Sequence, residues 1–276
     1  MLQIRNETDC LKEIIVCSPY NFELIKPINR TQEYFFKQAS PQYEILLAEH
    51  NSFVKTLENH GIKTYHQKSI KGCPYQLFTR DIGFVISETL CIASMASELR
   101  QPEVETLLEL GLSNRWKMYR FTSNPIEGGD IILNEKSILV GIGSRTSKNA
   151  YKELVNLFSG QYEIVPMRLA DDILHLDTVL GIPSEKTLLV YSPGLPDGIP
   201  KCLCDYEVIS LDKEEAFTLA SNVLPLSPNC VISQKRHIRV NDLLNQKGLN
   251  VITVEMDEIT KLGGGPRCSV LPINRI

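Results

Sequence analysis

The chain has 276 residues, which is enough for one large domain or two ordinary ones and for a sizeable hydrophobic core. Hydrophobic residues make up 43% and charged residues 22% of the chain, as is typical of a globular protein. With 29 Lys and Arg against 33 Asp and Glu, the net charge of −4 argues against a dedicated binder of nucleic acids or anionic membranes.

The N-terminal residues MLQIRNETDC contain no apolar stretch typical of a secretory signal. No apolar run reaches the roughly 20 residues that a membrane helix needs. We therefore expect a cytoplasmic protein whose eight cysteines are mostly free thiols. The sequence has no C-x-x-C pair and no H-x-x-x-H pair, so we expect no structural metal site.

Amphipathic segments followed by a glycine recur along the chain, and a short apolar segment follows each of them. The pattern predicts helices at residues 43–60, 103–110, 148–159 and 238–247, each ended by the next glycine: Gly61, Gly111, Gly160 and Gly248. These glycines lie 50, 49 and 88 residues apart. The last gap leaves room for a fifth copy, which we expect near residues 212–224 without the glycine.

Pairs of β-rich segments joined by short polar turns lie between these helices. They comprise residues 82–86 with 90–94, 131–134 with 137–141, and 178–182 with 187–191. The repeated unit is therefore a set of strands plus one helix, about 45–50 residues long, and five copies favour a closed ring with strands at the centre and helices outside. An ordinary α/β sheet with accidental spacing is the alternative.

Four short polar segments carry residue types suited to chemistry: FTRD at 78–81, EGGD at 127–130, HLDT at 175–178 and GGGPRCS at 263–269. In the first, Asp81 precedes an apolar strand and needs a partner, which Arg80 could supply as a simple ion pair. In the second, Glu127 and Asp130 flank two glycines that let the backbone approach a ligand closely. A plain turn with exposed acids would have the same composition.

The third and fourth segments contain a histidine and a cysteine. If HLDT is a strand, His175 and Asp177 point to the same face, where an imidazole beside a carboxylate can act as general acid and base. Cys268 follows three glycines and is adjacent to Arg267, a setting that suits a thiolate nucleophile. A structural histidine and a buried structural cysteine are the alternatives. With Glu127, the two residues complete a set of nucleophile, base and orienting carboxylate.

The four motifs in this order resemble the guanidine-modifying enzyme superfamily, which includes arginine deiminases, agmatine deiminases, dimethylarginine dimethylaminohydrolases and amidinotransferases. The resemblance implies one domain over residues 1–276 with the fold of that superfamily, the five-bladed β/α propeller or pentein. It implies that Cys268 attacks the guanidinium carbon, that His175 transfers protons and that Glu127 holds His175. It also implies that the reaction needs no cofactor.

By the same resemblance, Asp81 and Asp177 would bind the guanidinium nitrogens, as two carboxylates suit a cationic, fork-shaped donor. Arg145, in GIGSRTS, and Arg100, in ELRQPE, match arginines that bind the carboxylate end of the substrate. Surface salt bridges are the alternative for both arginines. Their presence favours arginine or an Nω-modified arginine over agmatine, which has no carboxylate.

Two features depart from the superfamily pattern. Arginine deiminases have an arginine five residues before the nucleophile, where this chain has Gly263. The short chain is similar in size to the dimethylarginine hydrolases, yet those enzymes typically have a lysine at the position of Asp177.

The sequence predicts a cysteine-dependent hydrolase that acts on a small guanidine compound through a covalent amidino-cysteine intermediate. Two alternatives stay open: an amidinotransferase that passes the amidino group to an amine, and a binder of a cationic metabolite without catalysis. The sequence also leaves a homo-oligomer open.

Overall fold

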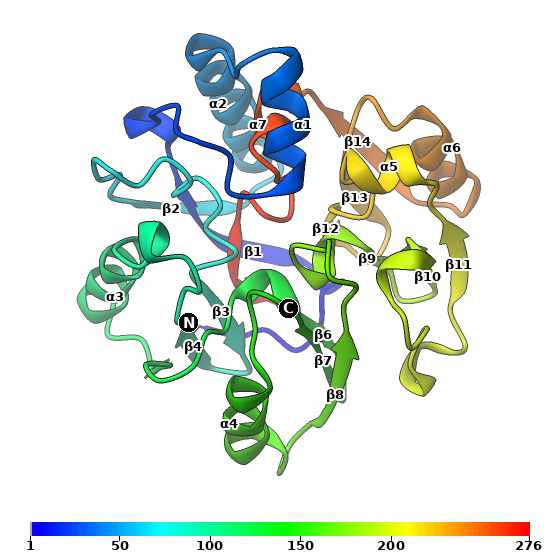
Figure 1. The fold of residues 1–276 in the computed structure, drawn as a ribbon. Coiled ribbons are helices and arrows are strands. Elements are labelled where there is room, and N and C mark those ends of the chain that lie inside the picture. The colour runs from blue at the N-terminus through cyan, green and yellow to red at the C-terminus, as the bar shows by residue number, and fades with distance from the viewer. Residues whose placement is uncertain (1) are drawn as a thin grey trace.

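The computed structural model describes residues 2–276, and these residues form five three-stranded sheets around a common centre (Figure 1). In each sheet the first two strands are antiparallel, and the middle strand pairs in parallel with the third. A parallel pair needs a crossover connection, and most of these crossovers are helices at the periphery. The five-bladed β/α propeller expected from the motifs is confirmed.

The blades are numbered by the order in which the chain enters their middle strands. Their elements are β15 (Leu271–Arg275), β1 (Leu11–Cys17), α2 (Tyr43–Asn59) and β2 (Lys63–Gln67) in blade one; β3 (Gly83–Ile86), β4 (Thr89–Ile92), α3 (Glu103–Ser113) and β5 (Met118–Arg120) in blade two; β6 (Ile131–Asn134), β7 (Ser137–Ile142), α4 (Lys148–Phe158) and β8 (Glu163–Arg168) in blade three; β9 (Leu180–Ser184), β10 (Thr187–Val190) and β11 (Glu207–Ser210) in blade four; and β12 (Leu224–Ser227), β13 (Cys230–Gln234), α6 (Ile238–Gln246) and β14 (Asn250–Val254) in blade five. Three further helices connect blades or cover the ring: α1 (Arg30–Gln38), α5 (Lys213–Phe217) and α7 (Asp257–Lys261).

Blade one closes the ring, because it contains strands from both ends of the chain. The C-terminal strand β15 pairs antiparallel with β1, with Ile14 opposite Pro272 and Ile15 opposite Leu271. Figure 1 accordingly draws the red C-terminal strand beside the blue β1 near the centre. Within residues 2–276, no helix is both long enough and apolar enough to cross a membrane.

The helices form where the sequence predicted them, because each has one apolar face. In α4, Ala150, Leu154 and Phe158 recur every four residues and are all buried, and the side chain of Ser147 caps the helix by accepting a hydrogen bond from the backbone N–H of Ala150. Gly61 and Gly248 follow α2 and α6 with φ of 76° and 84°, which is the left-handed conformation expected at a helix end.

Two details of the helix prediction are wrong. Gly111 does not end α3 but lies inside it, against Met118, where a side chain would collide with the methionine sulfur. A helix does form within residues 212–224, where the fifth copy was expected, but it is not the crossover of a blade. The short helix α5 lies between β11 and β12, so it connects two blades instead of the strands of one. The crossover of blade four, residues 191–206, contains two 3-10 turns, Ser192–Gly194 and Lys201–Leu203, and no α-helix.

The predicted strand pairs correspond to β3 with β4, β6 with β7, and β9 with β10. The sequence analysis did not identify the equivalent pair β12 and β13. Apolar side chains from the strands and from the outer helices form the core, which is divided into clusters between adjacent layers. The polar residues of the motifs lie apart from these clusters, at the inner ends of the blades.

Candidate active site

A short segment precedes the first strand of every blade, and these five segments meet at the centre of the ring. Each segment donates a hydrogen bond to a neighbouring segment. The backbone N–H groups of Arg80, Gly128 and Arg267 donate to the carbonyl oxygens of Cys268, Asp81 and Asn222, respectively. The N–H of Leu176 donates to Asp130 Oδ1, and the hydroxyl of Ser221 donates to the carbonyl oxygen of Asp177. All four predicted motifs belong to this central ring of segments. Their residues are distant in sequence but adjacent in space because the blades repeat around one axis.

The HLDT segment is not a strand, contrary to our expectation. His175 is extended, with φ −141° and ψ 162°, and it precedes a 3-10 turn over Leu176–Thr178. Strand β9 begins only at Leu180. A turn is needed here because the chain must reverse at the centre of the ring before it enters the blade.

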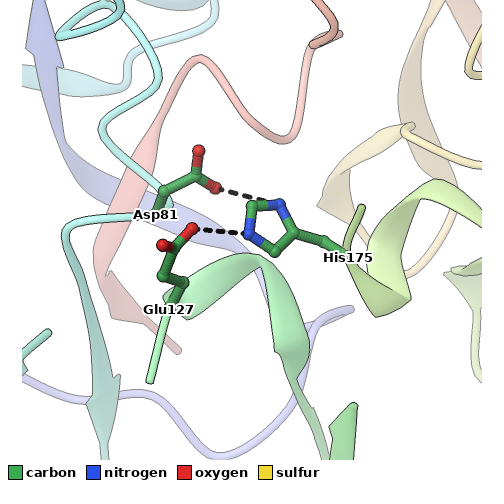
Figure 2. A group of neighbouring side chains, drawn as sticks. All are labelled: Asp81, Glu127 and His175. Carbon is green, nitrogen blue, oxygen red and sulfur yellow. Dashed lines mark hydrogen bonds and ion pairs between the residues drawn. The ribbon is translucent and has the colours of Figure 1, made fainter. Parts of the chain in front are cut away.

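The imidazole of His175 lies between two buried carboxylates (Figure 2). Its Nε2 is 2.7 Å from Glu127 Oε2, and its Nδ1 is 3.7 Å from Asp81 Oδ1. Gly129 allows this approach, since a Cβ at that position would lie 2.7 Å from His175 Nδ1. The EGGD and HLDT motifs are therefore packed directly against each other.

Burial and the neighbouring carboxylates determine the charge of His175. Burial alone would oppose the charged imidazole, but the carboxylates of Asp81, Glu127 and Asp130 outweigh it and raise the pKa of His175 to about 9. The pKa of Glu127 is lowered: burial opposes this shift, while the imidazolium and Arg145 favour the carboxylate. His175 is thus a protonated acid at neutral pH, held by an ionised Glu127.

Cys268 lies in a turn just before β15, with its side chain buried. Its Sγ accepts a hydrogen bond from Asn222 Nδ2 at 3.1 Å and lies 3.7 Å from Asp177 Oδ2. The amide oxygen of Asn222 in turn accepts from the backbone N–H of Cys268 at 3.0 Å. Asn222 therefore holds both the backbone and the sulfur of the cysteine.

Sequence reasoning missed Asn222. The signal that could have found it is its place just before β12, which is the same position that the four motifs occupy in the other blades.

Burial and the carboxylates of Asp177 and Asp81 raise the pKa of the Cys268 thiol well above its usual range. The cysteine is therefore a neutral thiol in the unliganded protein. A cation placed between the two carboxylates would offset their charge and favour the thiolate.

Arg100 differs from its expected role. Its Nη1 donates to Asp81 Oδ2 at 2.5 Å, its Nε and Nη2 contact Glu103, and Nη2 also reaches the carbonyl oxygens of Tyr75 and Phe78. With its guanidinium used in this way, Arg100 holds Asp81 in position and does not present a free fork to a substrate carboxylate.

Arg145 is differently placed. It makes only long contacts, 3.6 Å to Glu127 Oε1 and 3.5 Å to Ile28 O. It borders two adjoining hollows: a cavity of about 20 Å³ shared with Asp81, His175 and Cys268, and an outer pocket of about 370 Å³. Arg145 thus lies at the junction between the buried thiol and the outer pocket.

The inner cavity has room for about one water molecule, so a guanidinium cannot enter without displacement of the residues that cover it. The cover is the segment that begins α1, where Gln32 donates to Leu262 O at 2.7 Å and Asn29 lies against Gly263. Gly263 has a φ of 92°, and a Cβ there would lie 2.8 Å from Asn29 Nδ2. At this position a larger side chain would therefore displace the cover.

Asp81, Glu127 and His175 also offer three ligand atoms within 4.8 Å of one another, a spacing that could hold a metal ion. However, the guanidinium groups of Arg100 and Arg145 already lie beside these two carboxylates. A divalent cation would be close to both of them, so the donor set suits a protonated imidazole better than a metal.

Comparison with known proteins identifies one family whose model matches most of the chain. The family model described as "N,N dimethylarginine dimethylhydrolase, eukaryotic" matches residues 18–275. The uncharacterized protein YkgA of Bacillus subtilis is 34% identical over 272 residues, which cover 98% of this chain and 94% of that protein. The arginine deiminase of Bacillus cytotoxicus is 29% identical over 258 residues, and the match spans 73% of this chain but only 62% of the deiminase.

Among solved structures, the chain is similar to SxtG, an amidinotransferase from Microseira wollei in the saxitoxin biosynthetic pathway. The TM-score is 0.84 at 18% identity, with 99% of this chain and 97% of that chain covered. At this identity the similarity supports the fold alone.

Proposed function

The chain belongs to the N,N-dimethylarginine dimethylhydrolase family of guanidine-modifying enzymes, and we propose that it is a cysteine-dependent hydrolase of arginine or an Nω-modified arginine. One observation carries the proposal. The carboxylates of Asp81 and Asp177 lie close enough to Cys268 for their charges to raise the pKa of its thiol. Each has a buried oxygen, Oδ1, that accepts no hydrogen bond from residues 2–276. Two buried carboxylates near a thiol, each with an oxygen that accepts no hydrogen bond, are suited to the N–H donors of a guanidinium; Asp81 Oδ1 also lies 3.7 Å from His175 Nδ1.

The first step is attack of sulfur on the guanidinium carbon. The bound cation offsets the two carboxylates that keep Cys268 protonated, so the thiol loses its proton to solvent and the thiolate forms where the carbon lies. A C–S bond forms, and the C–N bond to the departing amine breaks. His175 donates its proton to that amine and becomes neutral, while Glu127 keeps the ring oriented.

The second step is hydrolysis. Neutral His175 takes a proton from water, and the hydroxide attacks the thiouronium carbon. The C–S bond then breaks to return the Cys268 thiolate, and the remaining hydroxyl proton passes to solvent as the ureido C=O forms. The products are a ureido compound and the released amine. In this hydrolase the covalent adduct keeps the carbon chain of the substrate, because only the terminal amine leaves in the first step.

The amino-acid part of the substrate would extend toward the outer pocket. Arg145 lies where the two hollows join and makes only long contacts in the unliganded protein, so its donors can bind a carboxylate. Arg100 supports the same site indirectly, because it holds Asp81.

An amidinotransferase is the second candidate, because the same thiol, imidazole and carboxylates are equally suited to the transfer of an amidino group. The cysteine chemistry is the same, but the alkyl amine departs first and only the amidino group stays on sulfur. An amine then takes the place of water. A binder without turnover would need neither the thiol nor the protonated imidazole.

The test is turnover on L-arginine, agmatine, Nω-methylated arginines and an alkylguanidine, with and without a chelator. Ureido product and released ammonia or methylamine are detected separately. We expect ureido product, from an arginine in preference to agmatine, and no effect of the chelator. Amidino transfer to an added amine without ureido product would support the transferase, and binding without either product would support the binder.

A further inference from the structure

Asp81, which lines the inner cavity, and Asp177, whose Oδ2 lies 3.7 Å from Cys268 Sγ, are held in the same way. Arg100 Nη1 donates to Asp81 Oδ2 at 2.5 Å, and Arg267 Nη1 donates to Asp177 Oδ2 at 2.7 Å. In both aspartates it is the other oxygen, Oδ1, that has no hydrogen-bond partner in the described part of the chain. Each arginine thus uses one nitrogen on one oxygen and leaves the second oxygen without a hydrogen bond, although Asp81 Oδ1 lies 3.7 Å from His175 Nδ1.

The opposite edge of each arginine binds a buried glutamate. Arg100 Nε lies 3.1 Å from both oxygens of Glu103, and its Nη2 lies 2.9 Å from Oε2. Arg267 Nε lies 3.3 Å from Glu7 Oε2, and its Nη2 lies 3.0 Å from Oε1. In both cases Nη2 also donates to backbone carbonyls, which fixes the plane of the guanidinium.

The two glutamates come from parts of the chain that contain none of the four motifs. Glu103 is the first residue of α3 and is fully buried. Glu7 lies in the N-terminal segment, outside the residues that the family model matches. The side chain of Asn6 accepts hydrogen bonds from the N–H groups of Thr8 and Asp9, and this turn directs Glu7 inward to Arg267.

We propose that Glu7 and Glu103 are positioning residues for guanidinium binding, because each holds its arginine in the orientation that leaves one oxygen of Asp177 or Asp81 free. The inference rests on the proposed function, in which these two oxygens bind the substrate. Arginine and carboxylate otherwise prefer a two-bonded fork. Without its glutamate, Arg267 or Arg100 can turn and bind both oxygens of its aspartate, which removes the acceptor that the substrate needs.

The test measures ligand affinity without requiring turnover. Alkylation of Cys268 is followed on its peptide by mass spectrometry at increasing concentrations of L-arginine, and the concentration that gives half-protection is the apparent affinity. We expect Glu7→Gln and Glu103→Gln each to weaken protection about tenfold, the loss of roughly one charge-assisted hydrogen bond. Where turnover is present, KM rises by the same factor, while kcat per folded molecule changes less.

Glu105→Gln is the matched control. Glu105 lies in the same helical turn as Glu103 and pairs with Arg120, but this pair is exposed and remote from the cavity, so protection stays unchanged. Glu7→Asp keeps the charge and should restore most of the affinity. If Glu7→Gln does not fold, protection is compared in Glu7→Asp and Glu103→Gln instead. Circular dichroism verifies that each variant is folded.

The outcomes separate the two proposals. Asp81→Asn and Asp177→Asn test the proposed function, because they alter the carboxylates themselves. If these two variants weaken protection but the folded glutamate variants do not, the positioning role is wrong and the proposed function stands. A merely structural role would reduce the folded fraction and leave the affinity of that fraction unchanged, which also contradicts the inference. If L-arginine and the other guanidines fail to protect the unaltered chain, the proposed function fails and this inference fails with it.

Discussion

The central ring of segments and the outer layer of crossovers follow different rules in this molecule. At the centre, all five blades place a short turn before the first strand, and hydrogen bonds connect every turn to the next. At the periphery, the crossovers range from the 17-residue helix α2 to the 3-10 turns of blade four. The central turns therefore keep the same place in every blade, whereas the crossovers differ from blade to blade, although parts of them, such as Asn29 and Arg145, reach the cavity.

The difference has a physical reason. An outer helix only has to cover an apolar sheet face, so its length and even its presence can change if other apolar residues cover that face. A central turn must place a charged side chain within hydrogen-bond distance of residues from other blades, and a shift of one position removes the contact. Substitutions at the centre should therefore impair chemistry, and those on the buried apolar faces of the outer helices should impair stability.

The largest effect is expected for Cys268→Ser. The variant should fold and should lose turnover by a factor on the order of 10⁴ or more, since it lacks the nucleophile. Product formation and thermal unfolding, measured on the same preparation, check both statements. Normal turnover by the serine variant would remove the proposed mechanism.

Asp177→Ala tests whether this carboxylate selects among guanidines. We expect kcat/KM for unsubstituted guanidines to fall about 100-fold, because a donor loses its acceptor in a buried site. Nω-methylated guanidines should lose less, since methylation already removes donors at that nitrogen. Equal losses for both substrates would mean that Asp177 does not discriminate between them.

The pH dependence tests the state of His175. Its pKa in the folded protein is raised to about 9, so the protonated acid is present at neutral pH and is lost as the pH rises through that value. We expect the single-turnover rate at saturating substrate, where the thiol has already lost its proton, to fall at alkaline pH as His175 loses its proton. Glu127→Gln removes one of the charges that raise this pKa, so the fall should begin at lower pH. An unchanged profile in that variant would contradict the role of Glu127.

Leu154→Ala tests the periphery. Leu154 is fully buried in α4, so the substitution should lower the free energy of unfolding by about 2–5 kcal/mol while kcat/KM stays within about twofold. Leu157→Ala, on the exposed side of the same helix, is the matched control and should change stability little. Denaturant unfolding and steady-state kinetics provide the comparison. A large rise in KM for Leu154→Ala would break the distinction between the two regions.

Much of this arrangement could be predicted from sequence, because its signals are local. Glycines and apolar spacing located four of the outer helices to within a few residues, and the order of the four motifs indicated the propeller and the residues that meet at its centre. The contact between His175 and Glu127 follows once those motifs converge.

The features that sequence reasoning missed depend on contacts between distant residues. Glu7 binds Arg267 from 260 positions away, and nothing in its neighbours distinguishes it from a surface acid. Asn222 precedes a strand that the pattern did not reveal. Arg100 matched a family motif, but its neighbour Glu103, three residues on, determines what its guanidinium binds.

Covalent catalysis by Cys268 is tested most directly by acid-quenched mass spectrometry of the Cys268 peptide during reaction with L-arginine and its Nω-methylated forms. The proposed mechanism requires an adduct on Cys268 that retains the carbon chain of the substrate, formed and consumed as ureido product accumulates. Ureido product with Cys268 unmodified at every time and with Cys268→Ser fully active would contradict it.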